Sequence, residues 1–402
     1  MTAFSVILQV YQITHSSGAV GAAGLIGALP SLLFAGFAGP LGDRYDRRRL
    51  VLLTSSMQAS VSILFAAQAL AGLRQVGVLY VLIAVQSLVG AVNAPARRAI
   101  TPRLLPRELL AAGGALNQLT MQVSLVCGPA LAGLVAAAWG LKFCYVVDAI
   151  SFGAALYGIG RLPAVPPAES SRKGPTLRAA GEAVRHVFAH KELLGAFLAD
   201  MCIGVIGVPV ALFPAINAER FGGLAATLGL LTAAEAVGGV LGSAFSGLAG
   251  HVRRLGRAAL IACALYGLAI VGFGLAHTLW LALALLVLAG AADVICVVFH
   301  STVVQLATPD ELRGRISSLE FMVGVGGTRL GSFRGGVFGS LFGATASVTG
   351  GGLAAVVGAG LIRIGLPAFH RFDVKDHQEA EEKDDDRVPA AAGVETGDAP
   401  ND

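Results

Sequence analysis

Long apolar runs joined by short polar connections make up most of this 402-residue sequence. Two of these runs, Gly18–Ala38 and Val51–Ala71, flank a Gly/Pro-containing turn that carries four arginines. A helix needs about 20 apolar residues to cross a hydrocarbon core roughly 30 Å thick. Because lipid cannot hydrogen-bond to the backbone, runs of this length are expected to cross a membrane as helices.

The composition excludes a single soluble globular domain. Apolar residues make up 55% of the chain and charged residues 13%, whereas about a quarter of the residues in a soluble domain are charged. The 53 glycines are typical of membrane helices that pack closely. Five cysteines, an odd number, all lie in apolar runs, which favours buried free thiols over a disulfide framework.

We predict twelve spans from the apolar runs. The first run has about 13 residues, fewer than a span requires. We therefore expect the first helix to be truncated, either because the natural start lies upstream or because the protein is a defective copy. The runs cover residues 1–13, 18–40, 50–72, 76–95, 108–138, 141–160, 193–217, 224–249, 257–276, 279–303, 314–342 and 345–366.

Basic residues alternate sharply between the two sets of connections. One set carries nineteen lysines and arginines and the other carries three: Arg74, Lys142 and Arg220. Short basic connections stay in the cytoplasm, so we predict a multi-pass protein of the bacterial inner membrane with a cytoplasmic C-terminus. Since the bases mark topology, we expect the lipid bilayer as a partner and no nucleic acid.

The longest connection divides the predicted spans into two sets of six. We expect a half at 1–160, a cytoplasmic linker at 161–192, a half at 193–369 and a disordered acidic tail at 370–402. Within the linker, residues 177–190 predict an amphipathic helix with Leu177, Val184, Val187 and Phe188 on one face. Three adjacent aspartates at 384–386 are interpreted as a solvated tail and not as a metal site.

A short internal repeat supports this division. Leu105–Leu109 resembles Thr308–Leu312, and Gly39–Leu50 has an echo at Gly247–Arg254. In the second copy of the first pair, Thr308 is predicted to cap a helix that begins at Pro309. The alternative is that any two helical membrane segments share glycine and arginine at their turns.

Ionisable side chains inside spans are candidates for mechanism, because each costs about 3 kcal/mol unless it is partnered. Glu235 lies near the middle of the eighth run among alanines and glycines. Such a setting suits a carboxyl group that binds and releases one proton per cycle. The alternative is a salt bridge to Arg329 or Arg334, which are also candidate contacts for an anionic substrate. Further proton-coupling candidates near the ends of their spans are Asp148, Asp200 and Asp293, and Glu320 is expected to pair with Arg313 or Arg315.

Neutral polar residues also occur within the predicted spans. Gln9, Gln118 and Gln122 are candidates for lining a wide and mostly apolar substrate cavity. Hydrogen bonds that join helices to one another explain the same residues equally well.

The turn after the second run now supports a family resemblance. Gly39, Leu41, Asp43, Arg44, Arg47 and Arg48 match the loop between spans two and three of the major facilitator superfamily, while Gly42 and Asp46 depart from it. Ala292–His300 and Gln305–Arg315 resemble the connection from span ten to span eleven in its twelve-span drug:proton antiporter branch. That branch often has arginine where this chain has His300.

This resemblance implies a fold, an activity and roles for particular residues. The fold would be an all-α membrane protein of two six-helix halves. In the loop, Asp43 would accept from backbone amides, and Arg44 and Arg47 would pair with acids across the closed cytoplasmic side, which biases one state of an alternating-access cycle. The segment Gly128, Pro129 and Gly133 resembles the antiporter kink motif and predicts a bend with close packing.

The function implied is secondary transport and not enzymatic catalysis. We expect a monomer without a cofactor or metal, driven by the proton motive force, that exports a small amphipathic drug, siderophore or metabolite by proton antiport. Two alternatives stay open at this point. One is proton-linked or uniport uptake of a metabolite, and the other is a non-transporting homologue, because the first span is short.

Overall fold

The computed structural model describes residues 1–44, 46–98, 100, 104–106, 109–163, 177–207, 209–245 and 252–373, with side chains described except at 31–44, 98, 111, 115, 177–180, 245, 310 and 311. All regular secondary structure in these ranges is helical, which confirms the predicted all-α membrane fold. The five cysteines are free thiols, and all except Cys127 are buried as the sequence predicts.

The six runs predicted before the linker each form a helix. The extent of each apolar run determines where its helix lies, and short turns of polar residues or glycine end the helices. The helices are α1 (Thr2–Thr14), α2 (Ser17–Arg44), α3 (Arg47–Leu70), α4 (Val76–Arg98), α6 (Leu110–Trp139) and α7 (Leu141–Gly160).

The linker helix and the six later runs follow. The helices are α8 (Leu177–Ala189), α9 (Lys191–Met201), α10 (Phe213–Arg220), α11 (Ala225–Phe245), α12 (Leu255–Leu275), α13 (Leu279–Leu306), α14 (Asp310–Phe342), α15 (Ala344–Gly365) and the short α16 (Pro367–His370). Between α9 and α10 lie a π-helical segment, η2 (Cys202–Gly207), and a 3₁₀ turn, η3 (Val210–Leu212).

Nine helical segments within the described ranges are long and apolar enough to cross a membrane. Three of the twelve predicted spans are not among them. α1 has 13 residues, α2 is counted only over Ser17–Pro30, the part whose side chains the structure describes, and the 33-residue α14 carries Glu320, Arg329 and Arg334. We attribute the low hydropathy of α14 to these charged residues and to its many glycines and serines.

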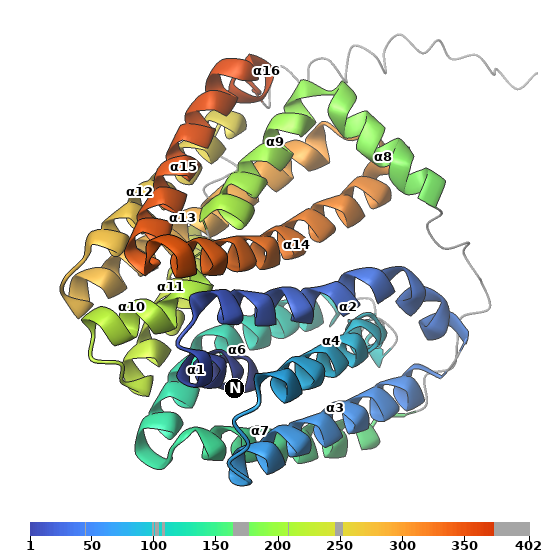
Figure 1. Ribbon diagram of the computed structural model, residues 1–402. Coiled ribbons are helices and arrows are strands. Elements are labelled where there is room, and N and C mark those ends of the chain that lie inside the picture. Colours follow the sequence, from blue (N-terminus) through green and yellow to red (C-terminus); the bar gives the residue numbers. More distant parts are fainter. Residues whose placement is uncertain are drawn as a thin grey trace, which may run out of the picture.

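Helices α1–α7 and helices α9–α16 form two groups that meet along their lengths. In Figure 1 the first group occupies the lower part of the view and the second the upper part, with α2 beside α14 at the junction. Glycines permit this contact, because a Cβ on Gly336 would lie 2.4 Å from the Ser17 carbonyl oxygen. In lipid, such close backbone approach supplies the packing energy between helices.

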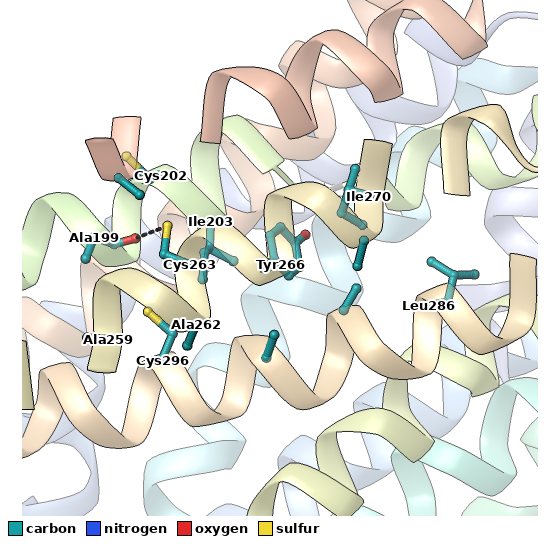
Figure 2. Packing of buried hydrophobic residues seen from close by; sticks show 14 of the residues in the cluster. Ala199, Cys202, Ile203, Ala259, Ala262, Cys263, Tyr266, Ile270, Leu286 and Cys296 are labelled. Atoms are coloured by element: carbon teal, nitrogen blue, oxygen red, sulfur yellow. Dashed lines mark hydrogen bonds between the residues drawn. The ribbon is translucent and has the colours of Figure 1, made fainter. Parts of the chain in front are cut away.

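Small side chains fill the point where three helices of the second group meet. α9, α12 and α13 meet around Ala199, Ala259, Ala262, Cys263 and Cys296, all of which are buried (Figure 2). Cysteine behaves here as a small apolar residue. The core continues to the end of the described chain, where Phe369 and Phe372 are buried, so the packed body extends a few residues past the predicted boundary at 369.

The seventh predicted span, 193–217, lies within the apolar segment Lys191–Arg220, which is long enough to cross a membrane, but this segment is not one regular α-helix. Its described residues form α9, the π segment, η3 and α10 in succession. Pro209 explains the break, because proline has no N–H to donate and its ring clashes with the carbonyl four residues earlier.

One local prediction, the cap at the start of α14, is wrong. α14 begins at Asp310, and Thr308 donates from Oγ1 to the Val304 carbonyl (2.5 Å) in the helix it follows, so it does not cap α14. The predicted amphipathic linker helix is present as α8, in which Ala183 and Val187 are buried while Val184 and Phe188 are exposed, so only part of its predicted apolar face packs against the bundle. An exposed ion pair from Glu182 Oε2 to Arg315 Nη1 (2.8 Å) joins α8 to α14.

Candidate functional site

A cavity of about 290 Å³ lies where the two groups of helices meet. This volume is at the lower end of the range for small-molecule sites, roughly 300–1,000 Å³. Its walls come from α1, α2, α3, α4, η3 and α14. Most lining side chains are apolar, including Val6, Ile7, Phe65, Ile83 and Val210.

Four polar side chains are part of this mostly apolar wall. They are Thr2 from α1, Gln86 from α4 and Arg329 and Ser332 from α14. The Oε1 atom of Gln86 is buried without a hydrogen-bond partner, and Arg329 is the one charged residue among those that line the cavity. An apolar pocket with a few polar groups is suited to an amphipathic molecule. Of the predicted cavity residues, Arg329 is the one that lies here.

Arg334 stabilises the broken seventh span instead of facing the cavity. Its Nε donates to the Val205 carbonyl at 3.0 Å, and its Nη2 donates to the Ile206 carbonyl. In an unbroken helix these carbonyls would accept from residues 209 and 210, but Pro209 has no N–H. The guanidinium therefore replaces missing backbone donors, which non-helical backbone at membrane depth requires.

The predicted glutamines lie in three different settings. Gln9 exchanges hydrogen bonds with Gln68 (3.0 and 3.2 Å) and accepts from the Tyr145 hydroxyl at 2.7 Å. Gln122 on α6 donates to the Ser243 hydroxyl on α11 at 3.5 Å, and Gln118 is exposed on α6. Two of the three thus join helices, as the alternative interpretation of these residues states.

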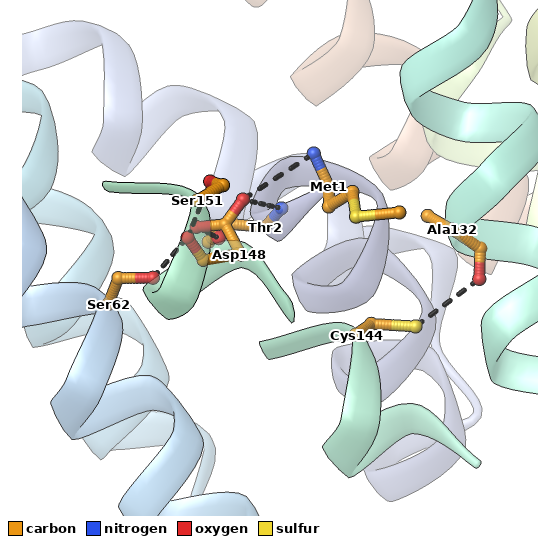
Figure 3. A network of polar contacts seen from close by, with 7 residues as sticks. All are labelled: Met1, Thr2, Ser62, Ala132, Cys144, Asp148 and Ser151. Carbon is orange, nitrogen blue, oxygen red and sulfur yellow. Dashed lines mark hydrogen bonds and ion pairs between the residues drawn. The ribbon is translucent and has the colours of Figure 1, made fainter. Parts of the chain in front are cut away.

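Asp148 on α7 is the centre of a polar network (Figure 3). Its Oδ2 accepts from Thr2 Oγ1 on α1 (2.6 Å) and from Ser62 Oγ on α3 (2.7 Å). Its Oδ1 accepts from the Thr2 backbone N–H at 3.3 Å. This carboxylate connects three helices of the first group.

Glu235 and Asp293 lie close enough to interact electrostatically. Glu235 is on α11 and Asp293 is on α13, two helices that pack so closely that a Cβ on Gly290 would lie 2.0 Å from the Glu235 carbonyl oxygen. Across the described residues, Glu235 has no ion-pair partner: Arg334 is engaged by η2 and Arg329 lines the cavity. The predicted alternative of a salt bridge to either arginine is therefore not observed.

Asp200 and Glu320 are brought together by His300, which sequence reasoning noted only as a departure from the family pattern. His300 Nε2 lies 3.5 Å from Asp200 Oδ1 and His300 Nδ1 lies 3.7 Å from Glu320 Oε1. Asp293 interacts electrostatically with both Asp200 and His300. The acids of α9, α11, α13 and α14 thus form one connected group. Glu320 was expected to pair with Arg313 or Arg315, but Arg315 pairs with Glu182.

The structure describes the side chains of only some residues of the loop motif. Arg48 donates from Nη2 to the Gly160 carbonyl (2.5 Å) at the end of α7, where a helix dipole favours positive charge. Asp46, which departs from the family pattern, caps α3 by accepting from the Arg49 backbone N–H at 2.9 Å. The side chains of Gly39, Leu41, Asp43 and Arg44 lie outside the described residues.

Of the two glycines in the predicted kink motif, Gly133 lies close to another helix and Gly128 does not. A Cβ on Gly133 would lie 2.8 Å from both the Ala225 carbonyl oxygen and the Gly229 Cα of α11, whereas a Cβ on Gly128 would meet nothing within 4 Å. Pro129 lies inside the continuous helix α6. Gly133 therefore joins α6 to α11 across the two groups of helices.

Comparison with proteins of known sequence identifies relatives. An enterobactin exporter of Citrobacter koseri is 29% identical over 362 residues, which cover 90% of this chain and 85% of that protein. An enterobactin exporter of Shigella boydii serotype 18 is also 29% identical, over 92% of this chain and 88% of its own length.

Solved structures of transporters share the fold. A bacterial homologue of the iron transporter ferroportin in its inward-facing state is similar with a TM-score of 0.68 and 16% identity, over 91% of this chain and 93% of that one. The nucleoside transporter NupG is similar with a TM-score of 0.66 and 13% identity, over 91% and 96%. At these identities the likeness concerns the fold alone.

The sequence profile of the transmembrane secretion effector family matches residues 6–394, nearly the whole chain. This match agrees with the loop motif, with the helical bundle and with the transporters that share its fold. The chain therefore belongs to the transmembrane secretion effector family of the major facilitator superfamily, and it is a multi-pass membrane transporter.

Proposed function

We propose that this protein exports a small amphipathic organic molecule from the bacterial cytoplasm by proton antiport through alternating access. Its C-terminus would then lie in the cytoplasm, on the side of the basic connections. The observation that carries the proposal is the cavity between the two groups of helices, with an apolar wall and Arg329. A central site between two helical halves is the plan of secondary transporters.

The direction of transport is supported by the relatives. Two proteins that match this chain over nine-tenths of its length are named as enterobactin exporters. The cavity chemistry fits a molecule with a large apolar surface and a polar or anionic group that Arg329, Gln86 or Ser332 can contact. A siderophore, a drug or another amphipathic metabolite satisfies this description.

Proton coupling is supported by the acids of the second group of helices. A carboxyl group at membrane depth is functional by default, and Glu235 has no basic partner in the described part of the chain. It lies beside Asp293, so ionising both would place two like charges together. An arrangement of this kind favours holding a proton at one of the two groups.

The test uses inside-out membrane vesicles with an imposed pH gradient, acid inside. Hoechst 33342, erythromycin and a catecholate siderophore are each added, and proton release from the lumen is recorded with a pH-sensitive acridine dye. We expect at least one compound to accumulate in the lumen and to release protons. Accumulation that is indifferent to the gradient contradicts antiport, and movement out of the lumen favours uptake in cells.

The variant Glu235→Gln is expected to insert at the normal level but to lose proton-coupled flux. The matched control is Glu219→Gln, because Glu219 is an exposed glutamate on α10. Insertion is measured by the amount of full-length protein in the membrane fraction. Coupling retained in Glu235→Gln would transfer the role to Asp148, Asp200 or Asp293.

A further inference from the structure

His300 is a buried imidazole placed between two acids from different helices. Its side chain is 3% exposed, and its two ring nitrogens lie 3.5 Å from Asp200 Oδ1 on α9 and 3.7 Å from Glu320 Oε1 on α14. Both ring nitrogens are buried and neither has a hydrogen-bond partner. This is a titratable group at ion-pair distance from two carboxylates, and the transport argument so far does not use it.

The chemistry of imidazole makes this geometry sensitive to one proton. Neutral histidine has one N–H, so one of its nitrogens directs a lone pair toward a carboxylate. Only the imidazolium has N–H donors for Asp200 and Glu320 together. Since the two acids lie against opposite ring nitrogens, they cannot share a single metal ion with His300.

The surroundings of His300 are acidic. Asp200 faces it from α9 and Glu320 from α14, and Asp293 on its own helix interacts with it electrostatically. The neighbouring titratable groups of α11 and α12, which interact with Asp293, are Glu235, Cys263 and Tyr266. A proton on His300 therefore adds a positive charge to a cluster of carboxyl groups.

The two helices that His300 joins also flank the break in the seventh span. Asp200 is two residues before the π segment. α14 contacts that segment directly, because a Cβ on Gly331 would lie 2.1 Å from the Gly204 carbonyl oxygen and Arg334 donates to the next two carbonyls. An interaction that links α9 to α14 therefore lies next to the π-helical segment η2, which directly follows α9.

We propose that His300 is a second proton-binding site, distinct from Glu235, at which the bound proton ties α9 to α14 through Asp200 and Glu320. Loss of that proton to water or to a neighbouring carboxylate removes one of the two N–H donors and releases one helix; no other bond changes. The inference rests on the proposed antiport, because such a tie contributes to transport only if the cycle binds protons.

Hydrogen exchange measured by mass spectrometry tests the tie without any substrate. The full-length chain in lipid nanodiscs is labelled at about pH 5.5 and about pH 8, which bracket ordinary histidine titration, with labelling times scaled for intrinsic exchange. We expect amides of α9 and of the first half of α14 to lose about tenfold in protection at the higher pH, since the ion pairs of the imidazolium with Asp200 and Glu320 are lost. The helix α15 is the internal reference.

Variants separate His300 from other histidines. His300→Gln is expected to show the same protection at both pH values, whereas His277→Gln, at an exposed histidine between α12 and α13, is expected to behave as the wild type. Asp200→Asn and Glu320→Gln keep the ring but leave it a single carboxylate, for which the one N–H of neutral imidazole suffices. In each of these variants both α9 and α14 should therefore lose their pH dependence. These two variants carry the test if His300→Gln does not fold.

Two results overturn the proposal. One is protection of α9 and α14 that does not change with pH in the wild type. The other is a pH dependence that persists in His300→Gln or, if that variant does not fold, in both single-acid variants. Failure of the antiport proposal is distinguishable: vesicle flux that ignores the pH gradient, with a pH-dependent protection that requires His300, removes antiport and leaves the proton site. Gradient-driven flux in vesicles, together with protection that does not change with pH, supports antiport and removes the proton site at His300.

Discussion

At the scale of single residues, the carboxylate of Asp148 is held in place by the hydroxyl groups that donate hydrogen bonds to it. Ser62 is fully buried and donates to Oδ2 at 2.7 Å, and Thr2 donates to the same atom at 2.6 Å. We expect Ser62→Ala to cost about 1–2 kcal/mol, because the carboxylate loses one donor inside the bundle. The apparent melting temperature should fall by about 2 °C.

Thiol reactivity during heating measures this change, because four of the five cysteines are buried and react with a dye only after unfolding. The control is Ser60→Ala on the same helix. Ser60 is exposed and donates to the Ser56 carbonyl within α3. Equal melting temperatures for the two variants would show that the Asp148 network contributes nothing to stability.

The sequence predicts which polar side chains lie inside apolar helices and roughly how far they lie from the helix ends. It does not predict which residues those side chains contact. A polar residue in an apolar helix shows only that some partner is needed. Gln9 was a cavity candidate, yet it is engaged by Gln68 and Tyr145. His300 was noted only as a departure from the family pattern, and its position between Asp200 and Glu320 depends on the packing of three helices. Such pairings join residues far apart in sequence, which no local pattern encodes.

At the scale of elements, the broken seventh span predicts a coupling between Pro209 and Arg334. Arg334→Lys replaces a planar group that reaches two carbonyls with a single ammonium. We expect a cost of about 1.5–3 kcal/mol, the usual value for hydrogen bonds to a charged group. In a Pro209→Ala background the new N–H can donate to the Val205 carbonyl, so the same substitution should cost less than about half as much.

The four proteins of this double-mutant cycle are compared by the same thermal assay. Arg363→Lys is the matched control, because Arg363 is an exposed arginine near the end of α15. Additive effects of Pro209→Ala and Arg334→Lys would mean that the guanidinium does not replace the donor that proline lacks.

Helix positions were predictable because length and apolarity alone decide which segments cross lipid. The predicted runs and the observed helices agree closely outside the seventh span. The break was missed because proline is tolerated in membrane helices when another group supplies the lost hydrogen bonds. That group, Arg334, is on a helix more than a hundred residues away, so its role as a replacement donor required the structure.

At the scale of the whole molecule, Gly133 and Gly128 separate two explanations of the motif that they share. If the motif acts through contact between α6 and α11, Gly133→Ala places a Cβ 2.8 Å from the Gly229 Cα and forces the two groups of helices apart. Gly128→Ala meets nothing and should be neutral or stabilising by up to about 1 kcal/mol, the ordinary gain for alanine in a helix. We expect Gly133→Ala alone to lower the melting temperature and gradient-driven flux in vesicles. If both variants lose flux while keeping their melting temperatures, the motif acts by bending α6 around Pro129. In that case the contact between the two groups is incidental to transport.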